Sequence, residues 1–245
     1  MKIELVSYRS GLQCKGRLKL TTEIINNSSS DLLLFSGHTV CYVEDIARLR
    51  SGITNTKSGA IFELKNINSG FISNSLYHIK SGDVISLNTN QVFSNSSEIS
   101  NNYELANRFL HELETNRRLK INGKNITILQ CGEILILEYC KSEDKGVKFR
   151  FSNDAELNIR FEKILSVTDI FLNPIHTPMA RQWQMEKRRQ FLSSNNRFYF
   201  STSNSIKDSE NLKVKSMQYA LSNGNHLLSE DPIVDTYFIR RIFEI

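Results

Sequence analysis

A cysteine and a carboxylate stand almost side by side where an apolar run of the sequence is interrupted. The run is ITILQCGEILIL, residues 126–137, in which Cys131 and Glu133 flank a glycine. A thiolate attacks a carbonyl or nitrile carbon when a base or a positive charge lies beside it. A turn from a strand into a helix would also bring backbone N–H groups near the sulfur, where they stabilise an oxyanion. The residues alone therefore leave two interpretations open: Cys131 is a nucleophile, or it has the commoner role of a small buried apolar residue.

Two histidines also follow predicted strands. His38 comes just after the apolar run LLLF, and His176 comes just after DIFLNP. The carboxyl ends of neighbouring parallel strands meet at one edge of a sheet, where ligands bind. We therefore expect His38, His176, Glu133 and Asn90 to share a pocket with Cys131. Histidine titrates near neutral pH, so His38 is a candidate base; the alternative is a histidine at a loop end that binds nothing.

The elements that must position these residues follow from hydrophobic periodicity. Apolar residues at helical spacing predict helices over 16–27, 43–52, 101–117 and 155–167, and a more polar helix over 180–192. Short β-rich runs lie between them, and Asn122-Gly123 predicts a tight hairpin. Helices alternate with single and paired strands, which indicates an α/β fold with helices outside a mixed sheet system. We expect residues 1–245 to form one domain.

Composition limits the class of protein. The chain has 245 residues, 40% of them hydrophobic and 23% charged, as in ordinary soluble globular domains. A net charge of +5 permits an acidic partner without requiring one. No apolar run is long enough to span a bilayer, and the sequence does not open on a secretory leader. We expect no membrane association.

Cysteine usage indicates the redox setting. The four cysteines, at positions 14, 41, 131 and 140, form no CxxC pair and no zinc-like cluster with histidine. In a chain of this size we expect no disulfide framework, and therefore a reducing, cytoplasmic location. No sequence motif for a metal or an organic cofactor is present, so we expect neither.

The order of several short segments resembles the carbon–nitrogen hydrolase family, the nitrilases and related amidases. These segments are DLLLFSGH, SGDVISLNTNQVFSNSSEI, INGKNITILQCGEI, DIFLNPIHTPM and KRRQFLSSNNRFYFSTSN, and they span nearly the whole chain. The resemblance implies a four-layer α-β-β-α sandwich, usually dimerised through its helices. It also implies amide or nitrile chemistry with a cysteine nucleophile, a glutamate base and a lysine that stabilises the oxyanion.

Carried over residue by residue, the resemblance is incomplete. Cys131 matches the nucleophile and Glu98 matches the family's second glutamate, which supports the base or the lysine. The Pro-Glu pair that carries the family's base falls at Ser36-Gly37, and the lysine falls at about Asn90. Loss of acid–base help alone lowers rates by about 10² to 10⁴. His38 is then the candidate substitute base, with Glu98 or Glu133 assisting.

Three functions stay open at this point. The first is a nitrilase-like hydrolase with a modified site, acting on a small amide or nitrile. The second is a catalytically inactive protein of the same fold, which senses a ligand or assembles with a partner. The third is nucleic-acid binding through the basic run 181–189, although such a run is more often a solvated helix face. In the first two, His176, Asn90 and Arg188 would contact the ligand, and we expect a homo-oligomer.

Overall fold

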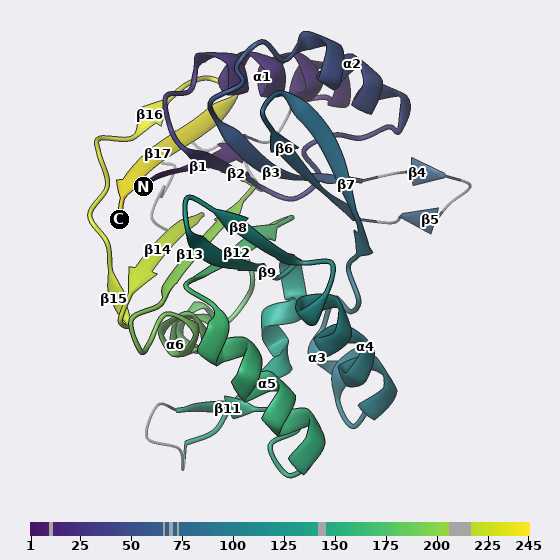
Figure 1. The fold of residues 1–245 in the computed structure, drawn as a ribbon, viewed down its shortest axis with the longest axis vertical. Helices are drawn as coiled ribbons and strands as arrows, with labels where there is room; N and C mark the ends of the chain where they lie inside the picture. Colours follow the sequence, from purple (N-terminus) through teal and green to yellow (C-terminus); the bar gives the residue numbers. More distant parts are fainter. Residues whose placement is uncertain (10–11, 66, 69–70, 73, 142–145, 206–216) are drawn as a thin grey trace.

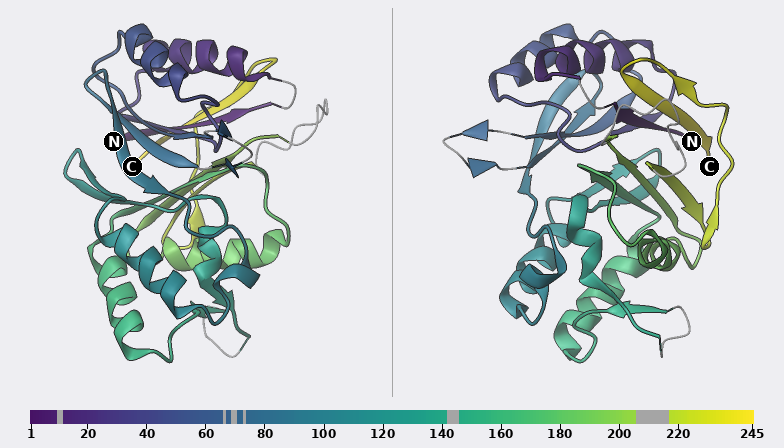
Figure 2. Two further views of the ribbon diagram at one scale, coloured as in Figure 1. Left: turned by 90° about the vertical axis from the view of Figure 1, so that its right-hand side faces the viewer. Right: turned by 180° about the vertical axis from the view of Figure 1, so that it is seen from behind.

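Two β-sheets lie face to face in the computed structural model, with helices on both outer sides (Figure 1). The structure describes all residues except 10–11, 66, 69–70, 73, 142–145 and 206–216. Figure 2 shows the sheets edge-on between an upper pair of helices and a lower helical layer. The predicted α-β-β-α sandwich is therefore confirmed.

The first sheet has a parallel centre. Its order is β16 (Ile233–Val234), β17 (Phe238–Glu244), β1 (Lys2–Tyr8), β2 (Leu32–Phe35), β3 (Gly59–Leu64), β6 (Ser75–Lys80) and β7 (Asp83–Asn90). The pairs β1–β2 and β2–β3 are parallel, and the other pairs are antiparallel. A small separate hairpin is formed by β4 (Ile67–Asn68) and β5 (Phe71–Ile72).

The second sheet is built in the same way. Its order is β15 (Asn225–His226), β14 (Gln218–Ser222), β13 (Phe198–Ser203), β12 (Ile170–Ile175), β9 (Lys124–Ile128) and β8 (Arg118–Ile121). Here β12 is parallel to both β9 and β13. β12 continues through Pro174, although proline is unusual inside a central strand. Because β9 pairs with it only as far as Leu172, the missing N–H of Pro174 breaks no bond with that neighbour.

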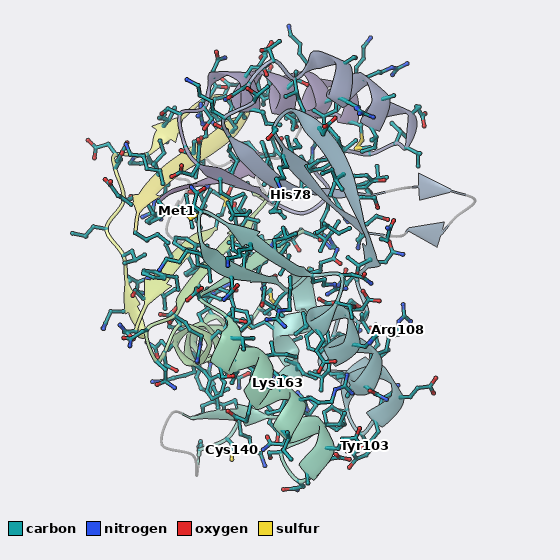
Figure 3. All side chains as sticks on the ribbon, viewed as in Figure 1. Met1, His78, Tyr103, Arg108, Cys140 and Lys163 are labelled. Carbon is teal, nitrogen blue, oxygen red and sulfur yellow. A yellow bond between two sulfur atoms is a disulfide. The ribbon has the colours of Figure 1, made fainter. Side chains whose placement is uncertain are left out.

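Side chains alternate between two cores along each central strand, as the strand period requires. Leu32 and Leu34 of β2 enter the core between the sheets, whereas Leu33 and Phe35 pack under the outer helices. Ile170 and Leu172 of β12 face the same inter-sheet core, and Phe171 faces the lower helical layer. Figure 3 shows side chains filling the space between the sheets.

The five predicted long helices are all present, each within three residues of its expected bounds. They are α1 (Cys14–Asn27), α2 (Glu44–Gly52), α4 (Tyr103–Glu114), α5 (Ala155–Val167) and α6 (Gln182–Leu192). The structure adds the short α3 (Ser96–Ile99), the 3-10 turn η1 (Cys131–Ile136) and a hairpin of β10 (Leu137–Tyr139) and β11 (Val147–Phe149). Asn122 and Gly123 form the predicted hairpin turn, both with positive φ.

One expectation about the cysteines is wrong. Cys14 and Cys41 form a disulfide across a sequence separation of 27 positions. The bond joins the start of α1 to the segment that follows β2. Sequence spacing gave no signal for it, because the tertiary fold alone brings these two segments together. Cys131 and Cys140 lie outside the disulfide.

Candidate active site

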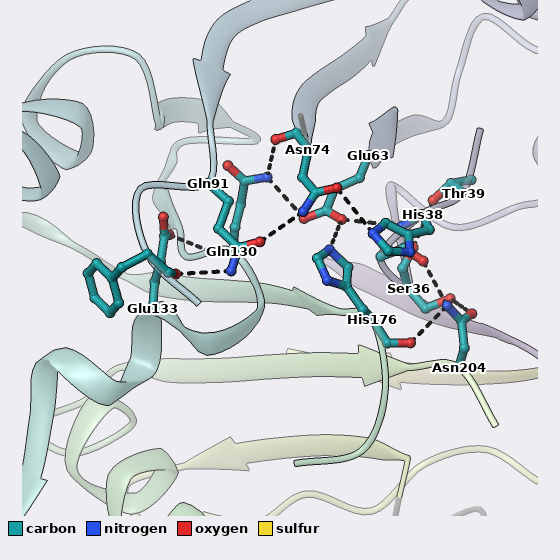
Figure 4. A network of polar contacts seen from close by, with 12 residues as sticks. Ser36, His38, Thr39, Glu63, Asn74, Gln91, Gln130, Glu133, His176 and Asn204 are labelled. Atoms are coloured by element: carbon teal, nitrogen blue, oxygen red, sulfur yellow. Dashed lines mark hydrogen bonds and ion pairs between the residues drawn. The ribbon is translucent and has the colours of Figure 1, made fainter. Parts of the chain in front are cut away.

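A buried carboxylate on β3 is the centre of a polar cluster at the carboxyl ends of the parallel strands (Figure 4). Glu63 is completely buried. Its Oε2 accepts a bond from His176 Nε2 at 2.7 Å, and its Oε1 accepts one from Gln130 Nε2 at 3.0 Å. The backbone N–H of His38 adds a third donor at 3.2 Å. Burial raises the pKa of Glu63, but the bond and charge of His176 outweigh it, so the pKa lies below the usual value.

His176 lies between this carboxylate and the thiol of Cys131. Burial disfavours the charged imidazolium, but hydrogen bonds to Cys131 and Glu63 outweigh it and raise the pKa of His176 to about 10. The ring is therefore positively charged at neutral pH. Cys131, His176 and Glu63 form a chain of thiol, imidazole and carboxylate. Such a chain is the arrangement by which a base activates a nucleophile and a third group orients the base.

Cys131 occupies a strained backbone corner. It is the first residue of η1, and its φ of +40° lies in the left-handed region that side chains rarely adopt. The next residue must be glycine, because a Cβ on Gly132 would lie 1.9 Å from the carbonyl oxygen of Ser94. Strained residues of this kind cluster at active sites and persist only where the surrounding structure holds them.

Glu133 supplies much of that support. Its carboxylate accepts the backbone N–H of Gln130 at 2.7 Å and that of Val92 at 2.6 Å. It also pairs with the guanidinium of Arg117, and both side chains are fully buried. Arg117 in turn binds the hydroxyl of Thr89. Glu133 therefore fixes the corner that carries Cys131, and its oxygens are occupied by donors from three segments.

His38 stacks on the ring of His176 rather than bonding to the thiol. The two ring centroids are 3.8 Å apart, and His38 Nε2 lies 3.1 Å from Asn74 Oδ1. Burial, followed by the neighbouring charge of His176, lowers the pKa of His38 to about 4. His38 is therefore neutral at neutral pH, and its ring stacks on the charged ring of His176.

Gly37 leaves room for the His176 ring. A Cβ at residue 37 would lie 2.1 Å from His176 Cδ2 and 2.8 Å from Glu63 Oε2. Residue 37 is the position where the sequence resemblance places the base of carbon–nitrogen hydrolases. The imidazole of His176 thus occupies the space into which a side chain at that position would project.

The other expected site residues lie elsewhere. Asn90 is exposed at the end of β7, where its side-chain oxygen accepts the hydroxyl of Ser75 at 2.6 Å. Glu98 is exposed in α3, and its carboxylate caps the helix through Ser94 and Asn95. Arg188 is buried in α6 and donates to the carbonyl of Leu137 at 2.8 Å. The structure thus brings Cys131, His38, His176 and Glu133 together but not Asn90, Glu98 or Arg188.

Sequence reasoning missed the carboxylate and the amides of the cluster. Glu63 stands inside the apolar strand AIFEL, and a charged residue in a buried run was the one available signal. Gln130 precedes the nucleophile candidate, and its amide bridges Glu63 and the carbonyl of Asn74. Asn74 itself had no motif, because its place depends on a loop. Among the described residues, no cluster of three or more His, Cys, Asp or Glu side chains is arranged to hold a metal, and no helix could cross a membrane.

Comparisons with known proteins identify the fold. No protein-family model matches the sequence, and no curated protein matches it. Solved structures do match. The NitN amidase from Nesterenkonia sp. AN1 has a TM-score of 0.60 at 12% identity, covering 100% of this chain and 92% of its own. A CN-hydrolase superfamily protein from Xanthomonas campestris, with an arsenic adduct in its active site, has a TM-score of 0.56 at 12% identity, covering 100% and 90%.

A third match is a variant of the same amidase. A variant of the Nesterenkonia amidase carries the acetamide moiety of fluoroacetamide on its active-site cysteine, with a TM-score of 0.61 at 12% identity over 100% of this chain and 90% of its own. Identities this low describe the fold alone. The chain described here has the fold of the carbon–nitrogen hydrolases, the nitrilase superfamily.

Proposed function

We propose that this chain hydrolyses a carbon–nitrogen bond in a small amide, with Cys131 as nucleophile, His176 as acid and base, and Glu63 as the group that orients His176. The observation that carries the proposal is the charged His176 ring, which is bonded to Glu63 and lies against the thiol. An imidazolium beside a thiol stabilises the thiolate, which is the reactive form.

The reaction divides into two steps. The Cys131 thiolate attacks the amide carbonyl carbon, and the imidazolium of His176 gives its proton to the leaving amine as the C–N bond breaks. The resulting thioester is then hydrolysed: neutral His176 takes a proton from water, the hydroxide adds to the carbonyl carbon, and the C–S bond breaks. The product leaves as a carboxylic acid, which loses its proton to solvent, and His176 is again charged beside a thiolate.

In this scheme His176 takes the roles of both the glutamate base and the lysine of the family. The resemblance implies a glutamate base and a lysine that balances the oxyanion charge. His176 supplies the base from the space beside Gly37, and its imidazolium supplies positive charge near the reacting carbon. Glu63, itself buried and ionised, holds the ring in one orientation. The arrangement resembles the triad of cysteine proteases in chemistry, though not in fold.

The proposal is tested by measuring covalent labelling of Cys131 and amide turnover in the same set of variants. Fluoroacetamide, acetamide, butyramide and a simple nitrile form the first panel, with mass spectrometry of the intact protein and ammonia release as readouts. We expect fluoroacetamide to modify Cys131 and Cys131→Ser to abolish both signals, whereas the matched Cys140→Ser keeps both. Equal modification of Cys131 and Cys140, or turnover that survives Cys131→Ser, would contradict the proposal.

The inactive alternative makes a different prediction. If the fold binds a ligand without chemistry, amides will raise the melting temperature equally in the native protein and in Cys131→Ala, with no ammonia released. The nucleic-acid alternative has less support, because Arg188 and Arg189 of the basic run are buried rather than on a solvated face.

Location and assembly belong to the proposal as well. The sequence favours the cytoplasm, whereas a disulfide such as Cys14–Cys41 is typical of oxidising compartments. Fractionation of cells followed by thiol trapping would decide between them.

A homodimer through exposed helix faces is tested by light scattering over a range of protein concentrations.

A further inference from the structure

A cavity lies beside α6, and neither Cys131 nor His176 is among its lining residues. Its volume is about 480 Å³. Among the described residues, its lining includes three arginines, Arg150, Arg181 and Arg188, and a single carboxylate, Glu138. The lining thus has an excess of two positive charges. Its elements are α3, η1, β10 and α6, in the lower half of the molecule in Figure 1.

Arg188 is the most deeply placed of the three. Its side chain is 5% exposed, and its Nε donates to the carbonyl of Leu137 at 2.8 Å. Among the described residues, no carboxylate lies within ion-pair distance of its guanidinium. Burial, and then the charges of Arg150 and Arg181, lower its pKa to about 10, so it remains charged at neutral pH. A buried charge is costly unless it is paired.

The one carboxylate in the lining is already engaged. Glu138 lies 3.3 Å from Lys148 and 3.4 Å from Arg150. Two cations therefore share its charge before Arg188 or Arg181 is counted. Arg181 is exposed at the mouth, at the start of α6, with a positive φ of 53°. Its guanidinium is available to a ligand that enters from solvent.

The rest of the lining is apolar. Aliphatic and thioether surface comes from Leu135, Met179 and Met185. Tyr139 adds an aromatic ring, which packs edge-on against Trp183 with the two ring centroids 4.9 Å apart. Small-molecule sites typically combine such a surface with a few convergent polar groups. Arginine is the residue that best matches the planar oxygens of carboxylate and phosphate.

We propose that this cavity binds the phosphate or carboxylate of a small organic molecule whose apolar part packs on Leu135, Met179 and Tyr139. The anion lies between Arg150, Arg181 and Arg188 and compensates the excess charge of the lining. Cys131, His176 and Glu63 do not line the cavity. The proposal is therefore independent of the proposed hydrolysis, and it is tested in the Cys131→Ser background so that no turnover interferes.

The probes are inorganic phosphate, phenyl phosphate and benzoate, measured by calorimetry at constant ionic strength so that screening does not change between them. We expect phenyl phosphate or benzoate to bind more tightly than inorganic phosphate, because each adds apolar contact. The tighter of the two identifies the anion. Arg181→Ala removes one exposed cation and should weaken binding about tenfold.

Two further variants sharpen the test. Glu138→Gln removes the one carboxylate among the described lining residues and should tighten binding. Arg48→Ala removes an exposed arginine on α2, outside the cavity, and should leave binding unchanged. The proposal is overturned if none of the three anions binds, or if Arg48→Ala weakens binding as much as Arg181→Ala.

Discussion

The ring of His176 fills the space that a side chain at residue 37 would need. A Cβ on Gly37 would approach His176 Cδ2 to 2.1 Å, so the ring can lie here only because residue 37 is glycine. In the family that the sequence resembles, this position carries the catalytic base. In this chain the space beside residue 37 holds the imidazole of His176, which comes from the segment after β12.

Gly37→Ala should displace the histidine. The added methyl group would force the ring away from Glu63, and overpacking of this kind costs about 1 to 3 kcal/mol in the free energy of unfolding. We expect a lower melting temperature and slower labelling of Cys131 by fluoroacetamide. Gly59→Ala is the matched control, since its nearest neighbour would be 3.3 Å away. Wild-type labelling in Gly37→Ala would show that the ring does not depend on the glycine.

His176→Gln should remove the acid and base while keeping a polar side chain of similar size. The expected loss in turnover is about 10² to 10⁴, the range for general acid–base catalysis. His38→Gln should lower turnover much less, because His38 stacks on the ring and is neutral. Steady-state rates of ammonia release measure both. Equal losses in the two variants would assign the base to the pair rather than to His176.

The charge of His176 also gives stability a pH dependence. The pKa of His176 is about 10 in the folded chain and 6.5 as the ordinary value, so the folded state holds its proton over a range where the unfolded state has lost it. The stabilisation is complete below about pH 6.5 and is lost as the pH rises through about 10. Thermal melts should show the difference between wild type and His176→Gln shrinking over this range. A difference that grows with pH would contradict the assignment.

Glu133 and Arg117 should behave as a buried ion pair whose loss is mainly structural. Removing one partner leaves the other charge buried, which costs about 3 to 5 kcal/mol. We expect Glu133→Gln to lower the midpoint of denaturant unfolding strongly, with Arg117→Met/Glu133→Leu recovering part of the loss. If Glu133→Gln reduced turnover without changing stability, Glu133 would act in the chemistry itself, as the sequence first suggested.

The Cys14–Cys41 disulfide should stabilise the N-terminal part of the first sheet. Closing a loop of 27 residues contributes about 3 to 4 kcal/mol in the chain-entropy description. Reductant should therefore lower the melting temperature of the wild type but not that of Cys14→Ser/Cys41→Ser. An unchanged melting temperature in reductant, with both thiols then titratable, would mean that the bond adds nothing to stability.

Sequence patterns predicted helices outside a mixed sheet system, and the family resemblance implied the four layers. Neither predicted which side chains of the site contact one another. The helices followed from periodicity, and Cys131, His38 and His176 followed from their place after buried strands. The pairing of His176 with Glu63 could not be read, because it depends on the register of β3 against a loop of the opposite sheet. The roles first given to Glu98 and Asn90 came from the resemblance, and these two side chains are exposed outside the cluster. Both the contact between His176 and Glu63 and the Cys14–Cys41 disulfide depend on tertiary structure, for which the local sequence carries no signal.

The central claim is that the charged His176 activates the thiol of Cys131, and the rate of alkylation of Cys131 with and without this histidine tests it most directly. Iodoacetamide labelling of the native protein at pH 7, followed by mass spectrometry, should show Cys131 reacting much faster in the wild type than in His176→Gln. An equal rate in the wild type and in His176→Gln would contradict the account.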